Sequence, residues 1–158
     1  MGSRVICLGW NIKKGQNNPA FLSGTLTATT YQKVLAESLL PAAKGVFEVE
    51  CGDWELQQDK ATCHTAKSTK KWLSDQGVTV LNSWPTKGDD INPMENLWAI
   101  LDERLSHRRC TTLAGMKKLL LKEWDLLSQD LIDNLIDSIP DRLRRIRLAI
   151  GGSIKRVK

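Results

Sequence analysis

Short strand-like runs alternate with helical patterns in the first half of the chain, and only helical patterns follow them. Alternating apolar residues with β-branched side chains predict strands. The runs that fit are residues 4–12, 20–26, 46–51, 54–58 and 78–81. We expect the first two of these strands to pair with each other. This order predicts an α/β fold, with a mixed sheet flanked by helices and a helical C-terminal part.

Apolar residues three and four positions apart mark the helices. The first helix runs through Tyr31 and is expected to stop at Pro41, because proline cannot continue the hydrogen-bond ladder. Its successor covers 64–76, with Gly77 just past its end. After a loop at 82–91 comes the clearest stripe, formed by Met94, Leu97, Trp98, Leu101 and Leu105. The remaining helices are expected at 113–124, at 126–139, and from Pro140 to Gly151-Gly152.

Length and composition limit the class of protein. The chain has 158 residues, which suits one domain. A hydrophobic content of 41% with 26% charged residues excludes a disordered tail. No apolar run reaches the roughly 20 residues that span a bilayer, and no signal-peptide pattern opens the sequence. We therefore expect a soluble intracellular protein without a membrane partner.

The positive charge is concentrated at one end. The net charge is +5, but residues 141–158 contain seven Lys or Arg and a single Asp, so the first 140 residues are close to neutral. A basic C-terminal helix and tail at 141–158 could bind nucleic-acid phosphates through Arg142, Arg144, Arg145 and Arg147. A solvated basic helix has the same composition, and the sequence leaves both interpretations open.

Cysteine and tryptophan point to structure rather than to chemistry. Cys51, Cys63 and His64 resemble zinc ligands only superficially, since adjacent residues rarely reach one ion and no second pair follows. The six tryptophans are spread over the expected elements, so they favour anchoring of the core over a base-stacking platform.

Two carboxylates stand out by their position. Asp59 ends a strand, where side chains project into the crevice of an open α/β sheet, and Glu95 begins a helix after a loop. Such acids can bind Mg²⁺-type ions, which prefer carboxylate oxygens. A structural interpretation stays open for each. Asp59 can form a side-chain turn, and Glu95 can complete a capping box with Asn92.

Two motifs resemble mariner-type transposases of the Tc/mariner superfamily, which belong to the DDE class. QQDKATCHTAK around Asp59 is similar to the block of the second acid, and WPTKGDDINPMENLW around Glu95 is similar to the block of the third. The two acids are separated by 35 residues, close to the family spacing. SGTLTATTYQKVL and IPDRLRRIRLAIGG also fit. The resemblance extends from about residue 5 to residue 152.

The resemblance implies a ribonuclease-H-like catalytic domain that binds two Mg²⁺ or Mn²⁺ ions and cuts and joins DNA. It implies that Asp59 and Glu95 are catalytic, metal-binding acids. It also implies that His64 and Asn92 are supporting residues, which do not bind the metal themselves but stabilise the site. The family's first acid lies on a strand before residue 5, and no residue here corresponds to it. The N-terminal DNA-end-recognition region has no counterpart either.

These departures define what we expect of the chain. We interpret residues 1–158 as a partial catalytic domain of a mariner-like element, without the first strand of the sheet and inactive by itself. The alternative is a non-catalytic nucleic-acid-binding module that uses the basic C-terminal segment. DNA is the expected partner in both cases. The resemblance also implies residence in the nucleus. A homodimer is possible, and the sequence leaves the oligomeric state open.

Overall fold

The computed structural model describes residues 5–8, 11–12, 15–16, 19–50, 54–82, 84–85 and 88–149, with side chains from residue 19 onward except 46–50. The chain divides into two compact units. The first contains residues 1–8 and 20–88, and the second contains residues 9–19 and 89–158. Each unit is described separately below.

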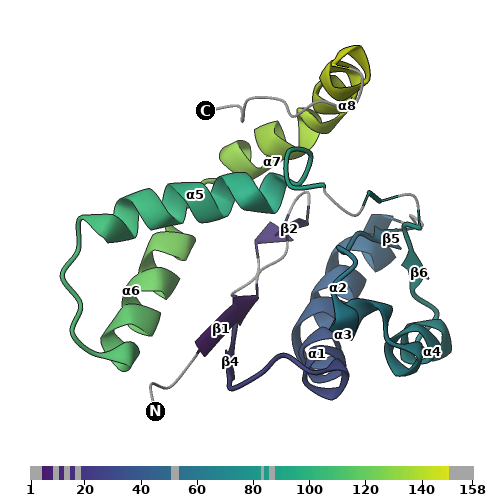
Figure 1. The fold of residues 1–158 in the computed structure, drawn as a ribbon, viewed down its shortest axis with the longest axis horizontal. Coiled ribbons are helices and arrows are strands. Elements are labelled where there is room, and N and C mark those ends of the chain that lie inside the picture. The colour runs from purple at the N-terminus through teal and green to yellow at the C-terminus, as the bar shows by residue number, and fades with distance from the viewer. Residues whose placement is uncertain are drawn as a thin grey trace. The chain divides into compact units, whose positions relative to one another are not determined.

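The strands of the described residues form three two-stranded sheets. In the first unit, β1 (Val5–Leu8) and β4 (Ala20–Ser23) are antiparallel (Figure 1). This pair confirms the expected pairing of the first two strand-like runs. In the same unit, β5 (Glu55–Leu56) and β6 (Thr79–Val80) are parallel. In the second unit, β2 (Asn11–Ile12) pairs with β3 (Gly15–Gln16).

The helix expected to stop at Pro41 instead continues through it. The α-helix α1 (Ala28–Val34) leads into a π-helical segment η1 (Leu35–Leu39) and then into α2 (Leu40–Glu50). Proline removes a backbone donor and crowds the preceding turn, and a π-helical turn can absorb both effects. The strand expected at 46–51 is therefore wrong for residues 46–50, which are helical. Residue 51 lies outside the described residues.

The helix expected at 64–76 is divided in two. A short helix α3 (Thr62–Thr65) is followed by α4 (Lys67–Asp75), with Ala66 in an extended conformation at φ −54° and ψ 140° between them. Gly77 lies just past α4 with φ +69°, as its position in the sequence predicts. In the first unit, α1, α3 and α4 pack against one another (Figure 1).

In the second unit, the described residues form four helices in addition to the β2–β3 pair. They are α5 (Pro93–Ser106), α6 (Leu113–Asp125), α7 (Gln129–Asp137) and α8 (Ile139–Leu148), coloured green to yellow in Figure 1. These bounds match the expected helices within a few residues. Beyond residue 149, the expected end at Gly151-Gly152 lies outside the described residues. None of the described helices is long and apolar enough to cross a membrane.

The apolar stripe of α5 supplies the core of this unit. Leu97 is fully buried and Leu101 is 1% exposed. Each such side chain stabilises the fold by about 1.5–3 kcal/mol relative to an exposed one. They pack with Trp124 on α6, with Leu127 in the connection that follows it, and with Ile132 and Leu135 on α7. Burial of this stripe fixes the rotation of α5, and therefore the direction in which its first turn faces.

Candidate active site

Asp59 lies shortly after β5 and directly before α3, where the sequence placed it. Its side chain is 62% exposed. The Oδ1 atom accepts a hydrogen bond from the backbone N–H of Ala61 at 2.9 Å, which is the side-chain turn that the sequence left open. Among the described residues, no hydrogen bond reaches Oδ2. One carboxylate oxygen therefore holds the loop and the other is available to a ligand.

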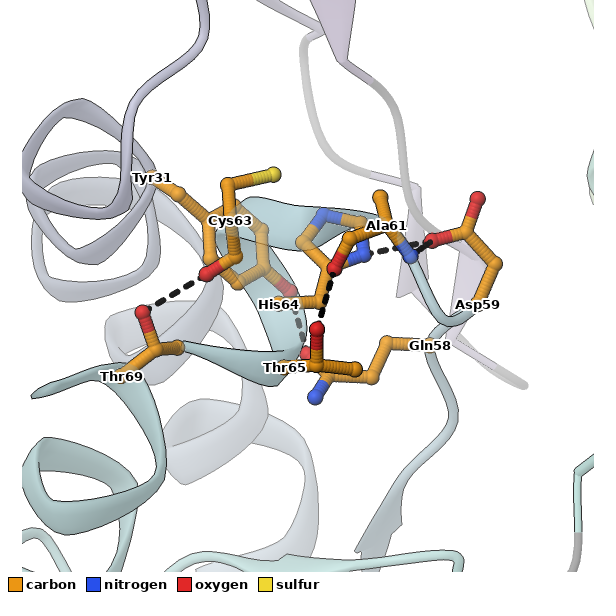
Figure 2. A network of polar contacts seen from close by, with 8 residues as sticks. All are labelled: Tyr31, Gln58, Asp59, Ala61, Cys63, His64, Thr65 and Thr69. Atoms are coloured by element: carbon orange, nitrogen blue, oxygen red, sulfur yellow. Dashed lines mark hydrogen bonds and ion pairs between the residues drawn. The ribbon is translucent and has the colours of Figure 1, made fainter. Parts of the chain in front are cut away.

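His64 on α3 contacts Asp59 directly. Its Nδ1 lies 2.6 Å from Asp59 Oδ1 (Figure 2). The histidine side chain is 13% exposed, and its Nε2 is buried with no partner in the part of the chain that the structure describes. This contact is what the supporting role expected of His64 requires. The role itself stays a prediction.

The ring of Tyr31, on α1, packs against the ring of His64. The two rings are 4.1 Å apart at their centroids and tilted by 40°. The Tyr31 hydroxyl donates to Gln58 Oε1 at 2.7 Å, in the residue before Asp59 (Figure 2). Burial raises the pKa of Tyr31, with Cys63 and Asp59 acting in the same direction, so the phenol stays a donor. Tyr31 was not among the expected site residues, although its motif, SGTLTATTYQKVL, had been matched to the family.

Buried hydrogen bonds anchor α3 behind the site. Thr69, which is fully buried on α4, donates from Oγ1 to the Cys63 carbonyl at 2.7 Å. Gln32 Nε2 donates to Thr69 Oγ1 at 3.3 Å. Cys63 is buried, and this burial raises the pKa of its thiol, which favours the neutral form. The described residues contain no group of three His, Cys, Asp or Glu that could bind a metal.

Glu95 lies in the first turn of α5 in the second unit. Asn92 caps this helix, because its side chain accepts a hydrogen bond from the Met94 N–H at 3.1 Å. Glu95 does not complete a capping box, and its carboxylate makes no hydrogen bond or ion pair with the described residues. By contrast, α1 has a full capping box between Thr27 and Thr30. The structural alternative for Glu95 is therefore not realised, and its carboxylate is available.

The donor chemistry at these two positions fits a divalent cation. Asp59 Oδ2 and the Glu95 carboxylate are unengaged oxygens of the kind that Mg²⁺ and Mn²⁺ prefer. The structure places Asp59 with His64 in the first unit and Glu95 with Asn92 in the second. Each of the two residues therefore presents, within its own unit, a carboxylate that could contribute to holding such an ion.

The arginines of α8 do not behave alike. Arg142 is 1% exposed and donates to Asn96 Oδ1 at 2.7 Å. This burial argues against a contact of Arg142 with a DNA phosphate, and DNA binding by these arginines stays a prediction. Arg144 and Arg147 are exposed, and Arg145 is half-buried. Arg144 also pairs with Asp141 at 2.7 Å.

Comparison with known proteins agrees with both motifs. A family model described as DDE superfamily endonuclease matches residues 2–117. The chain belongs to this family. The Tc3 transposase of Caenorhabditis elegans is 31% identical over 155 residues, covering 97% of the chain and 46% of the relative. The Tc1 transposase of the same organism is 30% identical over 121 residues, covering 71% and 44%. The chain thus spans about half the length of these curated relatives.

Solved structures confirm the ribonuclease-H-like fold. The crystal structure of the catalytic domain of Mos1 mariner transposase matches with a TM-score of 0.76 at 17% identity, covering 97% of this chain and 82% of that one. The Mos1 paired end complex with Mg matches with a TM-score of 0.84 at 21% identity, covering 98% and 46%. The chain therefore shares the fold of the Mos1 catalytic domain, and the DDE family to which it belongs is the one that the motifs around Asp59 and Glu95 indicated.

Proposed function

We propose that Asp59 and Glu95 are metal-binding acids of a DDE-type site that acts on DNA phosphodiester bonds. The observation that carries this proposal is that each motif presents an unengaged carboxylate. The Mos1 structures with Mn and with Mg support a divalent ion as the cofactor. With two of the three family acids, we expect the 158-residue chain to bind the ion weakly and not to cleave DNA by itself.

The chain's own residues orient these carboxylates. The Ala61 N–H and His64 Nδ1 both contact Oδ1 of Asp59, which turns Oδ2 outward. The cap at Asn92 starts α5 three residues before Glu95. When bound, divalent ions activate the attacking oxygen and stabilise the leaving oxygen of a phosphodiester.

Metal binding tests this proposal directly. We expect Asp59→Asn and Glu95→Gln each to raise the Kd for Mn²⁺ by at least about 10-fold, because each removes a charged ligand from a site where even outer-shell changes matter that much. Titration of free Mn²⁺ by electron paramagnetic resonance measures the Kd. The matched control is Asp75→Asn, which removes an exposed carboxylate of the first unit that pairs with Lys71.

Equal Mn²⁺ affinity in all four proteins would contradict the metal role of the two acids. Mg²⁺-dependent nicking of DNA by the wild-type chain, lost in Glu95→Gln, would contradict its inactivity.

Homodimerisation stays a prediction. Residence in the nucleus is part of the proposal, since the proposed substrate is chromosomal DNA.

DNA is the proposed partner, since Mos1 transposase, whose fold this chain shares, has been solved as a paired end complex and with its left transposon end. We propose that Arg144, Arg145 and Arg147 contact phosphates.

Replacing Arg144 and Arg147 by glutamine is expected to reduce the slope of log affinity against log salt by about 2, one unit for each contact. Fluorescence anisotropy at several salt concentrations measures the slope. The control Lys71→Gln should leave it unchanged, and an unchanged slope in the double variant would rule out these contacts.

A further inference from the structure

Arg142 is a buried charge without a counter-ion among the described residues. The other buried charged side chain there, Glu123, lies 3.8 Å from Arg104 and 3.7 Å from Arg108. Arg142 instead has only neutral acceptors, and its Nη2 is buried without a partner in the described part of the chain. Burial lowers the pKa of Arg142, and nearby Arg145 acts in the same direction. A buried charge without a counter-ion costs folding free energy.

The hydrogen bonds of Arg142 connect α8 to the start of α5. Its Nε donates to Ser138 Oγ at 2.8 Å, which fixes the side chain against the beginning of its own helix. Its Nη1 donates to Asn96 Oδ1 at 2.7 Å and lies 3.5 Å from the Asp90 carbonyl oxygen. Asp90 precedes the helix cap and Asn96 lies in the first turns of α5. One guanidinium therefore contacts residues on both sides of Glu95.

The first turn of α5 needs such support. The N–H groups that begin a helix have no partner four residues earlier, so helix ends open readily. Here the Glu95 N–H reaches the Asn92 carbonyl oxygen at 3.2 Å. A contact from another helix limits this opening without touching the Glu95 carboxylate.

We propose that Arg142 is a positioning residue for Glu95, holding the start of α5 so that the acid keeps one orientation for a metal ion. The inference rests on the proposed function of Glu95. The Arg142→Gln variant tests it. Arg142→Lys is a milder change, because it keeps the positive charge but has a single donor nitrogen in place of the guanidinium.

Two measurements separate positioning from general stability. By hydrogen exchange, we expect the amides of Met94, Glu95 and Asn96 to exchange at least about 10-fold faster in Arg142→Gln, with the C-terminal half of α5 unchanged. The Mn²⁺ Kd should rise about 10–100-fold in Arg142→Gln and less in Arg142→Lys. The control Ile132→Val perturbs the core of the same unit and should lower Tm without either effect.

The outcomes are distinguishable. A lower Tm in Arg142→Gln, with local exchange and Mn²⁺ affinity as in the wild type, would overturn the positioning role. A second outcome is faster local exchange in Arg142→Gln, with the wild-type Mn²⁺ Kd in both Arg142→Gln and Glu95→Gln. It would support the structural contact of Arg142 and overturn the proposed metal function of Glu95. Faster exchange and weaker Mn²⁺ binding, with partial recovery in Arg142→Lys, would support both.

Discussion

Replacing Trp124 by alanine is expected to lower the free energy of unfolding of the second unit by about 3–5 kcal/mol. Its side chain is fully buried among Leu97, Leu101, Leu127, Ile132 and Leu135. Its ring also lies 5.6 Å from that of Trp98, tilted by 43°. The loss combines the transfer of a large apolar surface with the cavity left behind. Urea denaturation followed by circular dichroism measures the change.

A neighbouring leucine provides the control for this prediction. Leu126 is 59% exposed, so Leu126→Ala should change the free energy of unfolding by no more than about 0.5 kcal/mol. If Trp124→Ala were as mild as Leu126→Ala, α5, α6 and α7 would not share the core that the structure shows. Their packing on α5 would then give no account of how Glu95 is directed.

Replacing Tyr31 by alanine is expected to destabilise the first unit by about 3–5 kcal/mol. The side chain is 7% exposed, covers the His64 ring and donates to Gln58. Tyr31→Phe keeps the ring and loses only the hydroxyl, so its expected cost is about 0.5–1.5 kcal/mol. Thermal and urea denaturation of both variants measure the two contributions separately.

The control for Tyr31 lies on the same helix. Lys33 forms only an exposed ion pair with Glu37 at 3.8 Å, so Lys33→Ala should cost less than about 1 kcal/mol. Equal stability of Tyr31→Ala and Tyr31→Phe would mean that the ring does not pack behind the Asp59 loop. The hydroxyl would then be the sole contribution of Tyr31 to the site.

Local sequence determined much of the candidate site. The expected cap at Asn92 predicted the start of α5, and the structure confirms both the cap and the helix. The side-chain turn at Asp59 was likewise an open alternative that the structure realises with Ala61. These features depend on residues within a few positions of each other, where the sequence is the whole environment.

Two secondary-structure predictions were wrong because local preferences for helix and strand compete in the same segment. Residues 46–50 alternate like a strand, yet they continue a helix. Propensity differences amount to a few tenths of a kcal/mol per residue, and extending an existing helix avoids the nucleation step that a new one requires. Pro41 was expected to end that helix, but the π-helical segment ahead of it lets the chain continue.

The sequence by itself determined the family and the helical order of the second unit, and it predicted the two acids. Tertiary structure decided which charged residues are exposed. Arg142 is one of four arginines in an apparently uniform basic helix, and it is internal because it contacts Asp90 and Asn96, the latter 46 residues away. The cover that Tyr31 provides over His64 is likewise a contact between separate helices. Composition and periodicity report the preferences of a segment, whereas burial depends on what other segments bring against it.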